Sequence, residues 1–415
     1  MPATKLSAAS KPKSPGKALS RRDLLKAASC LGLMLGGGGL LAGALVRPSR
    51  AGLPEPLRDA RYWVSASADQ VRCLACHTAA DGVTGSRYEH TQAIVQCQLC
   101  AQNCVLKENE RGRCRARMNV GGRLKTLVYG RPVSVHVDPI EKKPFYHFLP
   151  GAAAFSLASA GCPLSCRFCQ NWEISQARPE DFPGPFIPPE KVAEAARQRE
   201  ALVVAYTYNE PTVFTEYLID IARAGRPKGL RNVMISCGFM NPAPLGELLT
   251  VLDAIKIDLK GYSPDFYRRV CGARLEPVLA SIRKVAKSGV HLEIVNLVVP
   301  TLNDSKKMLA DLAAWVMGEA GPDVPVHFTR FHPDYQMRNL PPTPVDTLER
   351  AYDLARTAGL HYPYVGNVPG HPGNNTHCPN CGKTVIARTG FFVTENHIIQ
   401  GRCAFCRTPI AGVWS

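Results

Sequence analysis

The chain has 415 residues, of which 45% are hydrophobic and 20% charged, and it contains 16 cysteines. This length allows two or three domains with a sizeable core and argues against a short secreted scaffold held by disulfides. The formal net charge is +16, but lysines and arginines are spread along the chain. Because no basic helix or aromatic-interleaved patch stands out, we expect no nucleic-acid partner.

The amino-terminal residues are similar to a twin-arginine export signal. Arg21 and Arg22 in "SRRDLLK" precede the apolar run "SCLGLMLGGGGLLAGALV", and Ser49 and Ala51 offer small residues for cleavage. An uncleaved membrane anchor, or an extension of no export value, is the alternative. We predict a signal or anchor and linker over residues 1–53. The protein would then be exported to the periplasm or membrane-anchored through this segment alone, and cytoplasmic if the segment is not functional.

The segment from residue 54 to residue 130 is rich in cysteine and has few periodic stretches. Its run "CQLCAQNCVLKENERGRC" supplies Cys97, Cys100, Cys104 and Cys114. Four thiolates can close a zinc site or hold a second iron–sulfur cluster that relays electrons. The sequence leaves both possibilities open, together with free structural thiols.

A second cysteine pair lies upstream in "CLACH", which contains Cys73, Cys76 and His77. The pattern matches c-type haem attachment, but a five-residue match is weak. We prefer an extra metal-binding segment or a degenerate copy of the following "CQLC", with haem as the alternative.

Residues 131–367 alternate short apolar runs with helical patterns. The runs "AAFSLASA", "ALVVAYTY", "RNVMISC", "DAIKIDL", "LEIVNLVV" and "VPVHFTRF" are typical of buried parallel strands, and segments such as "PTVFTEYLIDIARA" between them are typical of helices. About six strand–helix units predict an α/β fold, a barrel or part of one, here a partial (βα)6 barrel similar to a TIM barrel.

Polar segments follow each predicted strand: "GCPLSC", "YNEPT", "CGFMNP", "DLKG", "PTLND" and "RFHPD". Each one taken singly is also typical of an ordinary turn. Because catalytic groups of such barrels lie at the carboxyl ends of the strands, the set predicts one functional rim.

The loop "GCPLSCRFCQNW" places Cys162, Cys166 and Cys169 within eight residues. Three cysteines leave one iron of a four-iron cluster without a protein ligand, whereas a partial zinc site or chance thiols are the bland alternative. The spacing, with Phe168 before the last cysteine, resembles the signature of radical S-adenosylmethionine enzymes. That resemblance implies a [4Fe-4S] cluster whose open iron binds S-adenosylmethionine and whose electron cleaves it to a 5′-deoxyadenosyl radical.

Further motifs between about residue 95 and residue 415 extend the resemblance, among them "VDPIEKKPFYHFLPG", "YTYNEPTVF", "IDLKG" and "GNVPGHPGNNTHCPNCG". They resemble the radical enzyme of the AmmeMemoRadiSam system, a relative of pyruvate formate-lyase activating enzymes. The resemblance implies an electron donor of the flavodoxin or ferredoxin type, and Memo-type and AMMECR-type partner proteins. It names no substrate.

The same resemblance assigns site residues. Cys162, Cys166 and Cys169 would ligate the cluster, and the residues expected around the cofactor are Phe168, Glu210, Asp258, Lys260 and His332. Lysine can pair with a carboxylate, and aspartate can bind a cation or a ribose hydroxyl. A solvated lysine–carboxylate pair is the structural alternative.

Three cysteines stand alone. Cys237 occupies a position where the family commonly has asparagine, and we interpret it as a buried small hydrophobe, with a substrate-facing thiol as the alternative. Cys237 and Cys271 are expected in the barrel away from the three-cysteine loop, and Cys30 in the leader.

The carboxyl-terminal residues 368–415 carry "CPNCG" and "CAFCR" around the β-rich "TVIARTGFFVTENHIIQ". Two cysteine pairs joined by hairpin strands predict a zinc-ribbon-like module with structural zinc, or rubredoxin-like iron, on one set of four thiolates. The ligands would be Cys378, Cys381, Cys403 and Cys406.

We therefore predict an oxidoreductase of the radical S-adenosylmethionine type, similar to activating enzymes, that abstracts hydrogen from an unidentified protein or small molecule. Installing a glycyl radical in a partner is one such reaction. The alternative is an electron-transfer or metal-binding protein with an inactive barrel. The polar rim favours the enzyme, because a pure carrier needs none.

Overall fold

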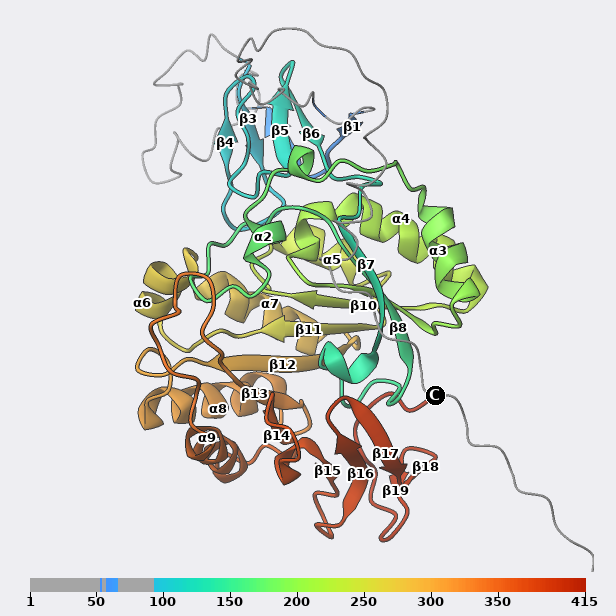
Figure 1. Ribbon diagram of the computed structural model, residues 1–415, viewed down its shortest axis with the longest axis vertical. Helices are drawn as coiled ribbons and strands as arrows, with labels where there is room; N and C mark the ends of the chain where they lie inside the picture. The colour runs from blue at the N-terminus through green and yellow to red at the C-terminus, as the bar shows by residue number, and fades with distance from the viewer. Residues whose placement is uncertain (1–52, 54–56, 66–92) are drawn as a thin grey trace, which may run out of the picture. The chain divides into compact units, whose positions relative to one another are not determined.

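The computed structural model describes residue 53, residues 57–65 and residues 93–415 (Figure 1). The predicted export signal, Cys30 and the "CLACH" segment with Cys73, Cys76 and His77 lie outside the described residues. Residues 51–415 belong to one compact unit. The predicted divisions after residues 130 and 367 therefore stay predictions.

An eight-stranded sheet, with its strands in sequential order from β7 to β14, forms the centre of this unit (Figure 1). The six predicted runs are confirmed as parallel strands: β8 (Ala153–Ala158), β9 (Val203–Tyr206), β10 (Arg231–Ser236), β11 (Ala254–Asp258), β12 (His291–Val298) and β13 (Val326–Arg330).

The two outer strands were not predicted. Strand β7 (Ser134–Pro139) pairs antiparallel with β8, so the sheet is mixed, and β14 (Pro363–Gly366) pairs parallel with β13. Most of β7 is partly or fully exposed, so it has no apolar run, and β14 has only four residues and begins with proline. Neither has the apolar length that marks the other strands.

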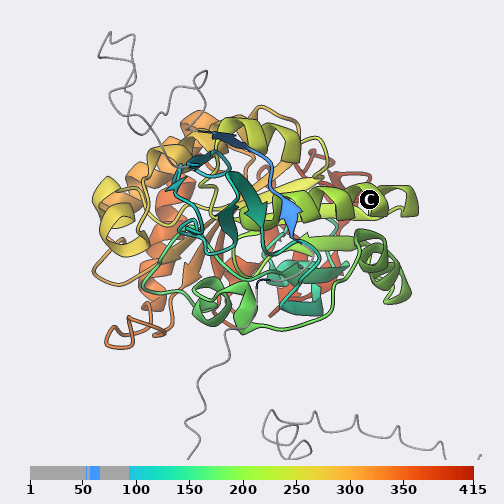
Figure 2. The same cartoon turned by 90° about the horizontal axis from the view of Figure 1, so that it is seen from above.

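Helices alternate with the strands and contact one another in chain order, α3 with α4, α4 with α5, α7 with α8 and α8 with α9 (Figures 1 and 2). The helices are α2 (Trp172–Ser175), α3 (Pro189–Gln198), α4 (Thr215–Gly225), α5 (Pro242–Leu248), α6 (Pro264–Phe266), α7 (Glu276–Ala286), α8 (Lys306–Ala320) and α9 (Val345–Thr357). The tighter turns are η2 (Ile140–Lys142), η3 (Pro179–Asp181), η4 (Pro211–Phe214), η5 (Arg226–Lys228) and η7 (Pro372–Asn374), and η6 (Tyr267–Cys271) is π-helical.

Successive side chains along each strand point to opposite faces of the sheet, and the two faces differ in character. Ile255 and Ile257 of β11 belong to the large core formed with the helices, whereas Ala254 belongs to a second apolar cluster on the other face. Lys256 and Asp258 share the face of Ala254, because side chains of a strand alternate with period two. The face opposite the helices therefore carries polar side chains toward the strand ends.

Small sheets flank the central one in the chain order. Before it come β1 (Arg58–Asp59), β2 (Trp63–Ser65), β3 (Val95–Cys97), β4 (Val105–Leu106), β5 (Arg117–Val120) and β6 (Arg123–Thr126), paired as β1-β6-β5 and β2-β3-β4. After it come β15 (Thr376–His377), β16 (Thr384–Thr389), β17 (Phe392–Asn396), β18 (Ile398–Ile399) and β19 (Arg402–Cys403), paired as β15-β16-β17 and β18-β19.

Within the described part of the chain, every helix is too short or too polar to cross a membrane.

Candidate active site

A cavity of about 530 Å³ lies on the polar face of the sheet. Seven of the eight residues predicted for cluster and cofactor binding line it: Cys162, Cys166, Cys169, Phe168, Glu210, Asp258 and Lys260. The structure thus brings residues from the ends of β8, β9 and β11 to one site. Their individual roles remain predictions.

The loop that carries the three cysteines is held on both sides. Gly161 begins it with φ +99°, and a side chain there would lie 2.2 Å from the carbonyl oxygen of Cys114, so only glycine fits. The backbone N–H groups of Ser165 and Arg167 donate to carbonyl oxygens of η6 at 3.0 Å each. The loop geometry is therefore fixed by its neighbours before any cofactor binds.

The three thiols suit a bound cationic cluster. Burial raises the pKa of Cys162 and of Cys169, and the neighbouring Cys166 raises both further. Backbone N–H groups of Leu164 and Asn171 donate to the sulfurs of Cys162 and Cys169 and favour their thiolates. A metal cluster would supply the positive charge that balances three converging thiolates.

The two lone barrel cysteines lie beside the loop, so the expectation that they lie away from it is wrong. The Cys271 thiol donates a hydrogen bond to Cys166 and lowers the pKa of Cys166, against the effect of burial. Cys237 lines the cavity, and the charges of Glu210 and Cys162 add to burial in raising its pKa. Turn η6 folds back onto the loop, which sequence separation did not indicate.

Glu210 is a fixed carboxylate that is only 1% exposed. Its Oε1 accepts hydrogen bonds from Thr212 Oγ1 at 2.6 Å and Ser236 Oγ at 2.8 Å, and its Oε2 accepts one from the Cys237 backbone at 2.7 Å. The residues after β9 and β10 therefore hold one acceptor group rigidly at the cavity wall.

Asp258 lies between two lysines. Burial would raise the pKa of Asp258, but the ammonium groups of Lys256 and Lys260 outweigh it and lower the pKa to about 2. Lys260 Nζ lies 3.2 Å from Asp258 Oδ2 and 5.8 Å from the ring centre of Phe168. This network lines the cavity, which argues against a solvated surface pair. Sequence reasoning missed Lys256, although its two-residue offset from Asp258 along β11 was a usable signal.

His332 is absent from the cavity lining among the described residues, and its predicted place around the cofactor stays a prediction. Strand β13 ends at Arg330, Phe331 is buried in the core, and His332 is exposed beyond it. The histidine of β13 that lines the cavity is His327, which shares its face of the strand with Thr329. That alternation in "VHFTR" was the available signal.

His327 is oriented by a buried carboxylate. Its Nε2 lies 2.6 Å from Glu293 Oε2, and Glu293 also accepts backbone hydrogen bonds from Tyr146 and His147. Because a carboxylate only accepts, Nε2 carries the proton and Nδ1 is left as an acceptor. Burial lowers the pKa of His327 even though Glu293 opposes this, so the ring is neutral near pH 7.

The far wall of the cavity carries a second charged group. Asp138 accepts from Lys142 Nζ at 2.8 Å and Lys143 Nζ at 2.5 Å, and both lysines and Tyr208 line the cavity. Phe391, between β16 and β17, also reaches the lining. The carboxyl-terminal sheets therefore contribute to the same cavity as the three-cysteine loop.

The four carboxyl-terminal cysteines form a compact group. Their sulfur atoms all lie within 4.8 Å of one another, with Cys378 and Cys406 at 3.5 Å and Cys381 and Cys403 at 3.8 Å. Four thiolates bound tetrahedrally to one ion at 2.3 Å would stand about 3.8 Å apart. The group could therefore hold a single metal ion.

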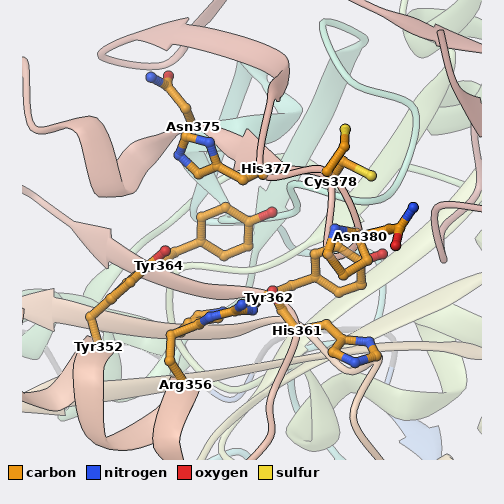
Figure 3. A pocket seen from close by; sticks show the side chains of 13 residues that line it. Tyr352, Arg356, His361, Tyr362, Tyr364, Asn375, His377, Cys378 and Asn380 are labelled. Carbon is orange, nitrogen blue, oxygen red and sulfur yellow. Dashed lines mark hydrogen bonds between the residues drawn. The ribbon is translucent and has the colours of Figure 1, made fainter. Parts of the chain in front are cut away.

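A separate cavity of about 480 Å³ lies between α9 and the first cysteine pair of this group (Figure 3). Tyr352 and Arg356 of α9 face Cys378 and Asn380 across it. It contains none of the residues predicted for cluster binding in the three-cysteine loop.

Comparisons with known proteins agree with this geometry. The family model described as the radical SAM superfamily matches residues 157–313. An uncharacterized protein of Methanocaldococcus jannaschii is 44% identical over 318 residues, which are 76% of this chain and 95% of that protein. A pyruvate formate-lyase-activating enzyme of Streptococcus mutans is 23% identical over 171 residues, which are 39% of this chain and 65% of that enzyme.

Among solved structures, a domain of the pyruvate-formate lyase-activating enzyme from Bacteroides vulgatus is 18% identical to the chain. The similarity covers 40% of this chain and 98% of that domain, with a TM-score of 0.36.

Proposed function

Because the chain belongs to the radical SAM superfamily, we propose that it is an enzyme that cleaves S-adenosylmethionine reductively at a [4Fe-4S] cluster held by Cys162, Cys166 and Cys169. The product radical would abstract hydrogen from a protein or small-molecule substrate. When bound, the cluster and S-adenosylmethionine supply the electron and the radical.

One observation carries this proposal. The three cysteines share a single cavity with a fixed carboxylate, Glu210, and a buried ion-pair network, Asp258 with Lys260. An electron carrier with an inactive barrel has no need of a cavity of about 530 Å³ lined by such groups. The arrangement therefore favours the enzyme over the metal-binding alternative.

The polar side chains of the cavity can each make a specific interaction with a bound cofactor or substrate. Glu210, held by four donors, can accept hydrogen bonds from an ammonium group. Asp258 stays ionised and can accept hydrogen bonds from hydroxyl groups, while Lys260 places a positive charge near Cys166. Neutral His327 can accept a proton or hydrogen bond at Nδ1 from a substrate.

The proposal also covers the reaction type, the metal of the Cys378 group, the partner proteins and export. Activating-enzyme chemistry is supported by the similarity to pyruvate formate-lyase-activating enzymes. Single-ion spacing supports zinc at the Cys378 group, since structural zinc prefers four thiolates in this geometry. Membership of the AmmeMemoRadiSam system, Memo-type and AMMECR-type partners, a flavodoxin or ferredoxin donor and export remain proposals from sequence.

The test is anaerobic reconstitution with iron and sulfide, reduction with dithionite, and assay for 5′-deoxyadenosine. The native chain should form it, and Cys166→Ala should reduce the rate at least a hundredfold, because a cluster ligand is lost. Cys30→Ala is the matched control and should keep the native rate. A native chain that holds its cluster yet forms no 5′-deoxyadenosine, or an equally active Cys166→Ala, would contradict the proposal.

A further inference from the structure

The amino-terminal cysteine group is gathered at a hairpin and the turn that follows. Strands β3 and β4 pair, and the Cys97 backbone N–H donates to the carbonyl oxygen of Cys104 at 2.9 Å. A Cβ atom added at Gly112 would lie 3.8 Å from Cys104 Sγ and 3.7 Å from Cys114 Sγ, so both sulfurs border this turn. Cys97, Cys100 and Cys114 are buried, whereas Cys104 is partly exposed.

Each of these four sulfurs accepts a backbone hydrogen bond. The donor to Cys104 Sγ is the N–H of Arg113, at 3.5 Å. The donors to the sulfurs of Cys97, Cys100 and Cys114 are the N–H groups of Leu99, Gln102 and Ala116. Backbone N–H groups directed at sulfur stabilise thiolates and are the second layer typical of metal–sulfur centres.

The sulfurs of this group are spaced more widely than a single ion requires. Among the described residues, the sulfurs of the Cys378 group all lie within 4.8 Å of one another. The sulfurs of the Cys97 group do not meet that spacing. One zinc ion would draw four sulfurs to about 3.8 Å. A cluster of several irons places metal atoms between its cysteines and holds them farther apart, so the spacing favours a cluster.

The group lies against the three-cysteine loop. Arg113 Nη2 lies 3.2 Å from Ser165 Oγ, and Gln102 Nε2 donates to the carbonyl oxygen of Pro163 at 2.8 Å. The carbonyl oxygen of Cys114 packs against Gly161 at the start of the loop. Arg113 is next in sequence to a cysteine of the group and Gln102 is two residues from one, so these contacts join the two cysteine-bearing segments directly.

We propose that Cys97, Cys100, Cys104 and Cys114 hold an iron–sulfur cluster through which electrons reach the cluster on the three-cysteine loop. The partly exposed Cys104 marks the side at which a reduced ferredoxin or flavodoxin would donate. One electron enters from that donor, which is oxidised, and one electron leaves for the loop cluster, so the relay itself is restored. This relay role rests on the proposed function, whereas the metal site does not.

The site is tested on the full chain as C162A/C166A/C169A, reconstituted with iron and sulfide in the presence of zinc. If the Cys97 group holds a cluster, the variant keeps iron and sulfide in equal amounts and shows an electron paramagnetic resonance signal when reduced. Addition of C100A/C114A should remove that iron. Zinc in place of iron at the Cys97 group, or no metal there, overturns the proposal, and neither result depends on S-adenosylmethionine cleavage.

The relay is tested on chains whose loop cysteines are intact. The rate of 5′-deoxyadenosine formation with reduced flavodoxin is divided by the rate with dithionite, in the native chain and in Cys104→Ala and C100A/C114A. We expect this ratio to fall at least tenfold in both variants, because dithionite is small enough to reduce the loop cluster directly. An unchanged ratio in variants that have lost the iron overturns the relay.

Discussion

The two four-cysteine groups of this chain use the same ligands in two different arrangements. The sulfurs of the Cys378 group lie 3.5 and 3.8 Å apart in pairs, as one tetrahedral ion requires. Those of the Cys97 group do not meet the 4.8 Å spacing among the described residues, although each accepts a backbone N–H. Sulfur spacing therefore separates a predicted single ion from a predicted cluster, where cysteine count does not.

The surroundings of the two groups differ as well. The Cys97 group contacts the three-cysteine loop through Arg113 and Gln102. The Cys378 group lies in the small sheets after β14, and Phe391 is the residue between Val368 and Ser415 that lines the active-site cavity, while Arg388 contacts Tyr146 of the lining from outside. This difference predicts a role in electron supply for the first group and a structural role for the second.

The largest effect is expected from removing the ion of the Cys378 group. The small sheets β15 to β19 share only a small apolar cluster with Tyr146, Tyr362 and Tyr364, and structural zinc typically contributes on the order of 10 kcal/mol to the folding of such modules. C378A/C381A should lose one zinc per chain and expose residues 368–415 to limited proteolysis. Iron content should not change. A protease-resistant variant with its zinc lost would show that the metal does not hold the module.

The next effect concerns the buried ion pair beside the Cys97 group. Arg117 and Glu216 are 1% and 7% exposed, with 2.6 Å between Nη2 and Oε2. Arg117→Met leaves Glu216 buried and unpaired, so the free energy of unfolding in urea should fall by about 3–5 kcal/mol.

The matched control is R117M/E216L, which removes both charges and should recover most of that loss. A single variant that loses less than about 1 kcal/mol would mean that the pair does not hold the amino-terminal sheets.

A smaller, pH-dependent effect is expected at Thr408. Its hydroxyl lies 3.3 Å from Cys406 Sγ, and together with the Thr408 backbone N–H it lowers the pKa of Cys406 to about 5. Thr408→Val removes one of these donors, so the pKa of Cys406 rises. Only the variant must then release an extra proton to bind zinc near pH 6, and its affinity should be severalfold weaker there.

At pH 9, where the Cys406 thiol is more fully ionised in both chains, the difference in zinc binding between the native chain and Thr408→Val should shrink in a chelator competition. Thr384→Val, which lies in the same sheets, is the control and should match the native chain at both pH values. A deficit of the same size at pH 6 and pH 9 would show that the hydroxyl acts by packing.

The smallest effect is expected at Phe391, through which the region of the Cys378 group reaches the cavity. Because this side chain is 40% exposed, Phe391→Ala should lower the free energy of unfolding by less than about 1 kcal/mol. Phe392→Ala, at a residue 69% exposed and absent from the cavity lining, is the matched control. If Phe391→Ala alone lowered the free energy of unfolding by much more than about 1 kcal/mol, the Phe391 ring would stabilise the protein more than its 40% exposure allows, and this prediction would be wrong.

Much of the fold followed from sequence, because β8 to β13 are buried apolar runs separated by amphipathic helices. Strand β7 was missed because it is half-exposed and antiparallel, and β14 because it is short. Those features depend on pairing partners distant in sequence, which local patterns do not report.

At the site, residues after β8, β9, β10 and β11 line one cavity, since parallel strands end on the same rim, whereas the segments "PTLND" and "RFHPD" do not line it. His332 lies beyond the buried Phe331 that follows β13, so its predicted role stays a prediction, and His327 was missed because it lies within the strand rather than at its end. The contact of Cys271 with Cys166 depends on the π-helical turn η6, which has no pattern in the sequence.

The metal inventory of the reconstituted native chain tests the central comparison most directly. Iron, acid-labile sulfide and zinc would be counted per chain after anaerobic reconstitution and removal of loosely bound metal. The account predicts more than four irons, sulfide equal to iron, and about one zinc, since the loop cluster holds four irons and the Cys97 group adds its own. Four irons with about two zincs would contradict it, because both four-cysteine groups would then hold single ions.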